Sequence, residues 1–127
     1  MALPQRHRLK GQRIFQTLYR RGRASHGPFL ALRWLPAQPE LLPPSQRHRT
    51  PSAWRCGVVV SSKVHKRAVR RNRMRRLLHD HLVQQAIANP EEPVWLLLSC
   101  KPGSAERDPA NLLGECDELL QRAGLSR

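Results

Sequence analysis

Residues 54–88 decide the fold, and they run WRCGVVVSSKVHKRAVRRNRMRRLLHDHLVQQAIA. The segment 54–61 contains a β-branched run bounded by polar residues, which predicts a central strand. A helix of about 20 residues is predicted over 66–88, because apolar residues recur there at helical spacing. The residues that set this spacing are Met74, Leu77, Leu78 and Leu82. Asn89-Pro90 ends the helix, since the residue before a proline disfavours helical backbone.

A second strand follows this helix. The continuous apolar run 94–99 is long enough for a buried strand and too short for a helix. A strand, a long helix and another strand make a βαβ unit, so the two strands are expected to be parallel.

Other elements flank this unit on both sides. Toward the N-terminus we expect a helix over 11–21, a short strand near 23–27 and a strand over 29–35. Asp108-Pro109 predicts the start of a C-terminal helix, with an acidic N-cap before a proline. Its apolar stripe consists of Leu112, Leu113, Cys116, Leu119 and Leu120.

The element order is therefore α-β-β-β-α-β-α, which predicts an α+β fold, an α/β sandwich with helices packed on a small mixed sheet. We expect a single domain across residues 1–127. The segment 36–52 holds five prolines. Its composition cannot build a packed element, so we expect a flexible loop there.

Positive charge is concentrated in the first part of the chain. Residues 1–79 hold 19 Lys/Arg and one acid, Glu40, whereas residues 80–127 hold four Lys/Arg and eight acids. The formal net charge of +14 points to nucleic acid or an anionic membrane surface as the partner. No run of about 18 apolar residues exists, so we expect no membrane span. The N-terminal residues lack the apolar stretch of a secretory signal, which favours a cytoplasmic protein.

The densest charge lies between Lys63 and Arg76, with eight positive charges and no negative one. No acid follows until Asp80, so repulsion along the helix is not relieved by pairs one turn apart. The planar fork of arginine makes two parallel hydrogen bonds to a phosphate and can stack on a base, whereas lysine offers a point charge. The segment therefore predicts close contact with a phosphate backbone.

A helical wheel divides these side chains between two sides of the helix. Asn72, Arg73 and Arg76 project away from the apolar side. Arg70 and Arg71 point toward it, so we expect them to lie beyond the edge of the sheet or along its rim.

The chain offers few groups for chemistry of its own, and we predict neither a catalytic residue nor a metal ligand. A metal-dependent nuclease needs converging carboxylates, and the basic region has only Glu40. In His79-Asp80-His81 the histidines are two residues apart, whereas ligands on one helix face need a spacing of four. The three cysteines, Cys56, Cys100 and Cys116, are predicted to be reduced thiols in the core.

Taken in their order along the chain, these helices, strands and motifs resemble the bacterial ribonuclease P protein family over nearly the whole chain. The run from Gly57 to Lys63, followed by Ala68 to Leu78 with its Arg71-Asn72-Arg73, resembles the strand and the "RNR" helix of that family. Weaker matches are Arg8-Leu9-Lys10, Phe15, Tyr19 and Gly22 at the opening helix, and Lys101-Pro102 after the last apolar run.

Two features depart from the family pattern. His79 stands where the family usually has arginine or lysine. The loop at 36–52 is longer than expected, so no function is carried over to Arg47 or Arg49.

The resemblance implies an accessory protein of a catalytic RNA. The ribonucleoprotein removes the 5′ leader of precursor tRNA by hydrolysis of one phosphodiester, with Mg²⁺ bound mainly by the RNA. The implied partners are ribonuclease P RNA and the leader of precursor tRNA, with no membrane and no small-molecule substrate. The family also has a left-handed βαβ crossover, which the usual right-handed rule does not predict.

Two groups of site residues follow from the charge pattern and the resemblance. The RNA-binding residues are Lys63, Lys66, Arg67, Arg70, Arg71, Asn72, Arg73, Arg75 and Arg76. The residues of a leader-binding cleft are Arg8, Lys10, Phe15, Tyr19 and Phe29. Basic grooves with stacking aromatics suit single-stranded nucleic acid, but core packing explains Phe15 and Tyr19 equally well.

Other functions stay open from the residues alone. A ribosomal or other structural RNA-binding protein would carry a similar basic helix, but it would not distinguish a leader-bearing RNA from a leaderless one. A stand-alone nuclease would cut RNA without a partner. A membrane-surface binder would need the same positive charge.

Overall fold

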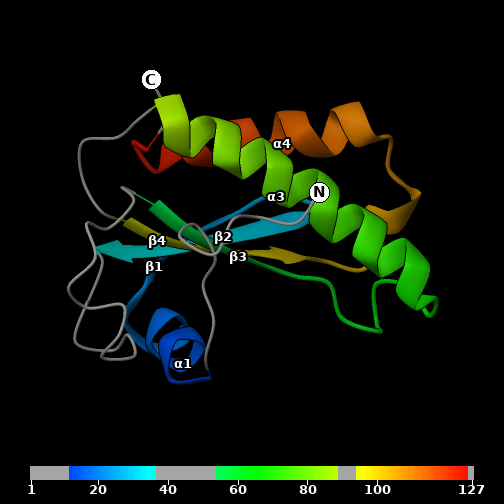
Figure 1. Cartoon of the computed structure of the whole chain (residues 1–127), viewed down its shortest axis with the longest axis horizontal. Helices are drawn as coiled ribbons and strands as arrows, with labels where there is room; N and C mark the ends of the chain where they lie inside the picture. The colour runs from blue at the N-terminus through cyan, green and yellow to red at the C-terminus, as the bar shows by residue number, and fades with distance from the viewer. Residues whose placement is uncertain (1–11, 37–53, 89–93, 126–127) are drawn as a thin grey trace.

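The computed structural model describes residues 12–36, 54–88 and 94–125. A four-stranded mixed sheet separates helix α1 from helices α3 and α4, as Figure 1 shows. The strands are β1 (Arg23–His26), β2 (Leu30–Pro36), β3 (Trp54–Val59) and β4 (Val94–Cys100). The helices are α1 (Gln12–Arg21), α3 (Ala68–Ala88), the 3-10 turn η3 (Ser104–Glu106) and α4 (Pro109–Arg122). The predicted α+β class and element order are confirmed.

The strands lie in the order β1-β2-β4-β3. β2 pairs antiparallel with both β1 and β4, whereas β3 pairs parallel with β4. The predicted parallel βαβ unit around α3 is therefore confirmed, because its two strands are direct neighbours. The left-handed sense of this crossover stays a prediction.

Strand alternation divides the apolar residues between two cores. In β2, Leu30 and Leu32 belong to the larger core, which α3 and α4 cover, while Leu35 belongs to a smaller core under α1. β4 supplies both cores, with Leu96 on one side and Trp95 on the other. Because β4 is buried on both faces, its sequence is apolar almost throughout.

The helices bury the predicted stripes. Met74, Leu78 and Leu82 of α3 are buried in the larger core. From α4, the buried residues are Leu112, Cys116, Leu119 and Leu120. On α1, Ile14 and Leu18 are buried in the smaller core.

One carboxylate ties the start of β2 to α4. Oε2 of Glu115 accepts hydrogen bonds from the backbone amides of Phe29, at 2.9 Å, and Leu30, at 2.6 Å. Gly27 makes room for it, since a Cβ there would lie 2.5 Å from the same oxygen. Nζ of Lys101 donates a hydrogen bond to the Gly27 carbonyl at 2.7 Å. The start of β2 is thereby fixed to α4 and to the residue that follows β4.

The 3-10 turn η3 was not predicted. Ser104 and Ala105 are buried in it, and it follows Gly103, whose φ of 92° lies in the left-handed region that favours glycine. The predicted loop at 36–52 falls outside the described residues, except for Pro36 at the end of β2.

Candidate nucleic-acid interface

The loop before α3 is held by one buried side chain and by hydrogen bonds of its backbone. Val64 is buried in the larger core, and its amide donates to the Ser61 carbonyl at 3.0 Å. The amide of Arg67 donates to Nδ1 of His65 at 3.0 Å. The Arg67 carbonyl then accepts the amide of Arg71 at 3.2 Å, which starts the helix.

Arg71 braces this loop from within the helix. Its Nη1 donates to the His65 carbonyl at 2.9 Å and to the Lys66 carbonyl at 2.8 Å. Arg70 reaches across to η3, where its Nη2 donates to the Ala105 carbonyl at 3.3 Å. The two arginines that the helical wheel turned toward the apolar side thus lie at its edge, bonded to backbone carbonyls.

The other predicted RNA-binding residues are exposed, except Arg75, which is half-buried. Arg73 and Arg76 are exposed on α3, and Lys63, Lys66 and Arg67 are exposed on the preceding loop. Asn72 is exposed as well, and its Oδ1 accepts a 2.7 Å hydrogen bond from Nη1 of Arg75.

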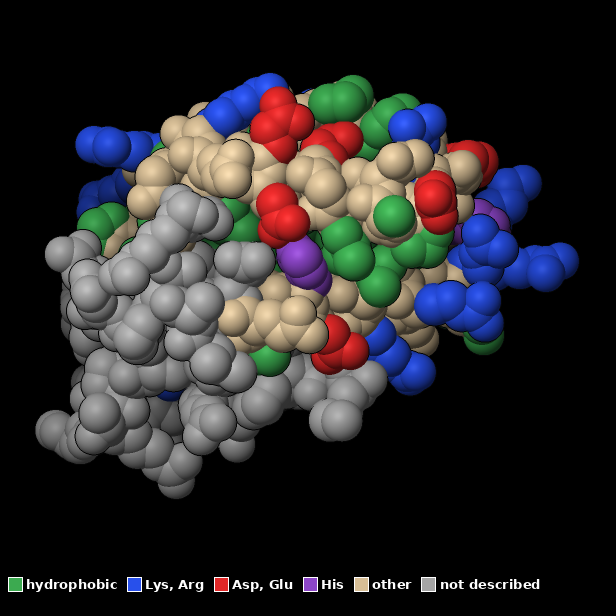
Figure 2. All heavy atoms as spheres, turned by 90° about the horizontal axis from the view of Figure 1, so that it is seen from above, with side chains coloured by type: hydrophobic (Ala, Val, Ile, Leu, Met, Phe, Trp, Pro, Cys, Tyr) green, Lys and Arg blue, Asp and Glu red, His purple; other side chains and the backbone are tan. Residues whose placement is uncertain are grey.

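We call these nine residues the basic end. They are Lys63, Lys66, Arg67, Arg70, Arg71, Asn72, Arg73, Arg75 and Arg76. Figure 2 shows the densest group of Lys and Arg side chains at the right-hand end of the face that α3 and α4 form, with fewer at the opposite end.

No carboxylate among the described residues forms an ion pair with the basic end. The ion pairs in that part of the chain include His81 with Asp117, at 2.6 Å, and Arg122 with Glu118, at 2.6 Å. The first turn of α3 contains no acid. A helix N-terminus already carries partial positive charge, so the cations add to it. A polyanion brought to this surface would relieve the repulsion.

A second candidate surface lies on the α1 side of the sheet. Tyr19 on α1 is 51% exposed, and the guanidinium carbon of Arg33 on β2 lies 4.7 Å from the centre of its ring. Phe15, half-buried one turn earlier, packs against the smaller core together with Val59. We call Phe15, Tyr19 and Arg33 the aromatic ledge. A ring with a stacked guanidinium offers both a stacking surface and a positive charge to a single strand.

Sequence reasoning missed Arg33, although a signal was present. Arg33 alternates with the buried Leu32, so the period of a strand turns it to the opposite face. An arginine on the face of the strand opposite Leu32 was therefore foreseeable. Its contact with Tyr19 was not, because that depends on which helix covers the face.

Phe29 does not join the aromatic ledge. It comes before β2 begins, and its ring packs against the larger core, with Arg107 stacked 4.8 Å from the ring centre. A Cβ at Gly103 would lie 3.2 Å from Cε1 of this ring. The structure thus brings Phe15 and Tyr19 together and places Phe29 elsewhere. Arg8 and Lys10 lie outside the described residues.

The three cysteines are buried and free, as predicted. Burial raises the pKa of Cys100 to about 11 and that of Cys116 to about 12. It raises the pKa of the Cys56 thiol still further. These thiols are therefore protonated near neutral pH, whereas a nucleophile or metal ligand must be a thiolate.

Potential metal ligands do not cluster in the described part of the chain. No group of three or more His, Cys, Asp or Glu side chains there could hold a metal ion. His81 joins α3 to α4 through Asp117. No helix among the described residues is long and apolar enough to cross a membrane.

Comparison with known proteins gives full-length matches. The family model Ribonuclease P matches residues 3–124. The ribonuclease P protein component of Parasynechococcus marenigrum strain WH8102 is 49% identical over 128 residues, covering 100% of both chains. That of Prochlorococcus marinus strain MIT 9313 is 48% identical, covering 98% of each chain.

Solved structures have the same fold. The RNase P protein of Staphylococcus aureus superposes with a TM-score of 0.76 at 16% identity, over 95% of this chain and 98% of that chain. The RNase P protein of Thermotoga maritima gives a TM-score of 0.69 at 18% identity, over 91% and 96% respectively.

Proposed function

This chain belongs to the ribonuclease P protein family, and from that premise we propose that its basic end binds the RNA subunit while its aromatic ledge binds the 5′ leader of precursor tRNA. The chain is a protein component of RNase P, the ribonucleoprotein endoribonuclease that processes the 5′ end of tRNA. Membership of this family excludes the alternative of an RNA-binding protein with no role in tRNA processing.

The observation that carries the first assignment is the uncompensated charge of the basic end. Arg73 and Arg76 are exposed, and within the described residues they have no acidic partner. Arg71 holds the preceding loop in place, so Lys63 and Lys66 are presented from an ordered segment. An ordered set of cations binds a folded RNA at a lower entropic cost than a mobile tail does. The basic end therefore suits a folded RNA subunit.

The aromatic ledge suits a different RNA. A leader is a flexible single strand whose bases are free to stack, and stacking on an aromatic ring does not depend on sequence. Tyr19 offers such a ring, and Arg33 adds charge for the adjacent phosphate. The ledge lies on the opposite side of the sheet from α3 (Figure 1), which would let one molecule hold both RNAs.

Mg²⁺ does not suit the groups at the basic end. The charged residues of the basic end are all cations, whereas Mg²⁺ prefers carboxylate, phosphate and water oxygens as ligands. We therefore assign the Mg²⁺ ions of the reaction mainly to the RNA. The protein's part is to neutralise phosphates and to position the leader, and we expect this to occur in the cytoplasm.

Leader-dependent binding tests the second assignment. Holoenzyme is assembled with wild-type protein or with Tyr19→Ala, and its affinity is measured for precursor tRNA and for mature tRNA. We expect Tyr19→Ala to weaken binding of precursor tRNA by about tenfold, a typical stacking contribution. Binding of mature tRNA should not change. Equal losses for the two RNAs would contradict a leader site at the aromatic ledge.

A further inference from the structure

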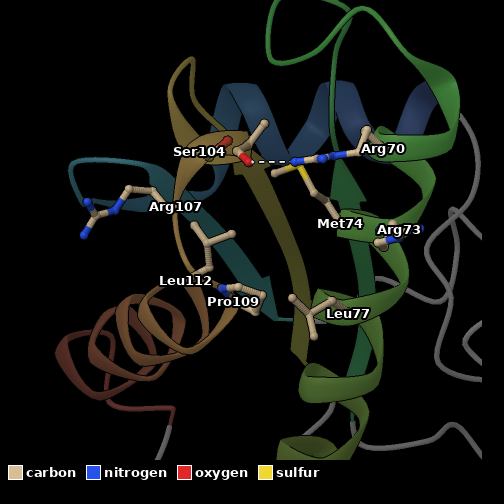
Figure 3. Close-up of a pocket in the computed structure, with 9 residues that line it drawn as sticks. Arg70, Arg73, Met74, Leu77, Ser104, Arg107, Pro109 and Leu112 are labelled. Atoms are coloured by element: carbon tan, nitrogen blue, oxygen red, sulfur yellow. Dashed lines mark hydrogen bonds between the residues drawn. The ribbon is translucent and has the colours of Figure 1, made fainter.

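A cavity of about 190 Å³ lies between α3 and the segment that connects β4 to α4. Figure 3 shows its walls: Met74 and Leu77 on α3 face Pro109 and Leu112 on α4, and η3 closes one end. The lining is mostly apolar. A cavity of roughly 150 Å³ with apolar walls is enough to hold a benzene ring. This space is therefore large enough for the ring of a nucleobase.

Arginines border the α3 side of this cavity. Arg70 extends toward η3 along one edge, held at 3.3 Å by the Ala105 carbonyl, and Arg73 lies on the same helix (Figure 3). Arg107 contributes to the lining but points its guanidinium away, toward the ring of Phe29. Two arginines of the basic end, Arg70 and Arg73, thus line the α3 side of the cavity.

The walls of the cavity are held by hydrogen bonds and core packing within the protein. Oγ of Ser104 donates to the Lys101 carbonyl at 2.7 Å, and the amide of Arg107 donates to the Ser104 carbonyl at 3.1 Å. Met74 and Leu112 are buried in the larger core. Because the polar groups of η3 are bonded within the protein, the cavity presents apolar surface to whatever enters it. A preformed apolar slot binds without a large ordering cost.

Building on the proposed contact between the basic end and the RNA subunit, we propose that this cavity receives one unpaired nucleobase of that RNA. The flat face of the base lies against Leu77 and Leu112, while Arg70 and Arg73 bind the phosphates on either side. The positive charge of the two arginines favours a nucleobase attached to a phosphate chain. The acids of the connecting segment, Glu106 and Asp108, form no ion pair with the two arginines in the described part of the chain. An apolar slot bordered by arginines that have no acidic partner among the described residues fits a ring attached to a phosphate chain.

The test fills the cavity without removing a charge. Leu77→Phe adds a ring to a half-buried side chain on the cavity wall, and Val83→Phe adds one to a half-buried side chain farther along α3. Each protein is bound to the RNase P RNA of Parasynechococcus marenigrum. Reagents that modify the pairing edges of unpaired bases then map the complexes. Affinity is measured over a range of salt concentrations.

We expect wild type and Val83→Phe to protect at least one unpaired base that Leu77→Phe leaves reactive. Leu77→Phe should lose about tenfold in affinity with an unchanged salt slope, because no phosphate contact is removed. If Leu77→Phe does not fold, Ala105→Val narrows the same cavity from η3 and should give the same pattern.

An unchanged pattern of protection and affinity in the cavity variants would overturn the inference. So would a loss of affinity in which no base changes its reactivity, since the cavity would then contact something other than a base. Failure of the wild-type protein to bind the RNA at all would instead refute the proposed function.

Discussion

Arg76→Ala is the substitution that most directly tests whether the basic end contacts phosphate. Arg76 is exposed on the outer side of α3, does not line the cavity, and has no ion pair or hydrogen bond among the described residues. Its removal should therefore leave the fold unchanged. An effect on RNA binding can then be attributed to the lost guanidinium and not to a changed fold.

The expected effect is a change in salt dependence. Each phosphate that a cation neutralises contributes about 0.7 to 0.9 to the negative slope of log affinity against log salt concentration. Removing one contact should therefore reduce the steepness by that amount. Between about 50 and 200 mM salt, the ratio of wild-type to variant affinity should narrow by about threefold.

The assay is equilibrium binding of the RNase P RNA at four or five salt concentrations, with thermal unfolding of each protein as a check on folding. Arg122→Ala is the matched control. Arg122 is also an exposed arginine, but it lies in the last turn of α4 and pairs with Glu118. Its slope should equal that of the wild type. A parallel shift of the Arg76→Ala line, with no change in slope, would refute a phosphate contact at this position.

Three further predictions concern the fold that supports these surfaces. Glu115→Ala should lower the free energy of unfolding by about 1–3 kcal/mol in thermal or urea unfolding, because the part-buried amides of Phe29 and Leu30 lose their acceptor. An unchanged free energy of unfolding would contradict this prediction, since water would then replace the carboxylate as the acceptor. Gly103→Ala should lower the free energy of unfolding by about 1–2 kcal/mol in the same measurement, since φ at Gly103 is 92° and the ring of Phe29 crowds the new Cβ. The control Gly114→Ala has open space around the new Cβ and should not destabilise the protein. Burial raises the pKa of Cys100 from 9.0 to about 11, so the unfolded thiol ionises first and the free energy of unfolding should be highest below pH 9 and fall from pH 9 toward 11. Cys100→Ala should reduce that fall, and an identical fall in the variant would contradict the assigned cause.

The element order was predictable because local patterns carry it. The β-branched run at 58–60, the helical spacing of Met74 and Leu78, and Asp108-Pro109 each specify one element without reference to the rest of the chain. A strand, helix and strand in sequence also favour a parallel pair. β3 and β4 form that pair.

The side-chain contacts were not predictable in the same way. Phe29 precedes β2, so strand alternation does not fix its direction, and its ring packs toward Gly103 and away from Tyr19. Arg71 was expected to contact RNA. Its hydrogen bonds to the His65 and Lys66 carbonyls depend on the path of a loop that no periodicity describes. The cavity depends on η3, a turn of three residues without a sequence pattern of its own.

Cleavage of 5′-labelled precursor tRNA at low Mg²⁺ tests the central claim most directly. It compares the RNase P RNA alone, this protein alone, and the two together. Cleavage at the mature 5′ end only when both are present is the predicted result, because the basic end is assigned to the RNA subunit and the catalytic metals to the RNA. Cleavage by the protein alone, or no effect of the protein on a properly folded RNA, would contradict the account.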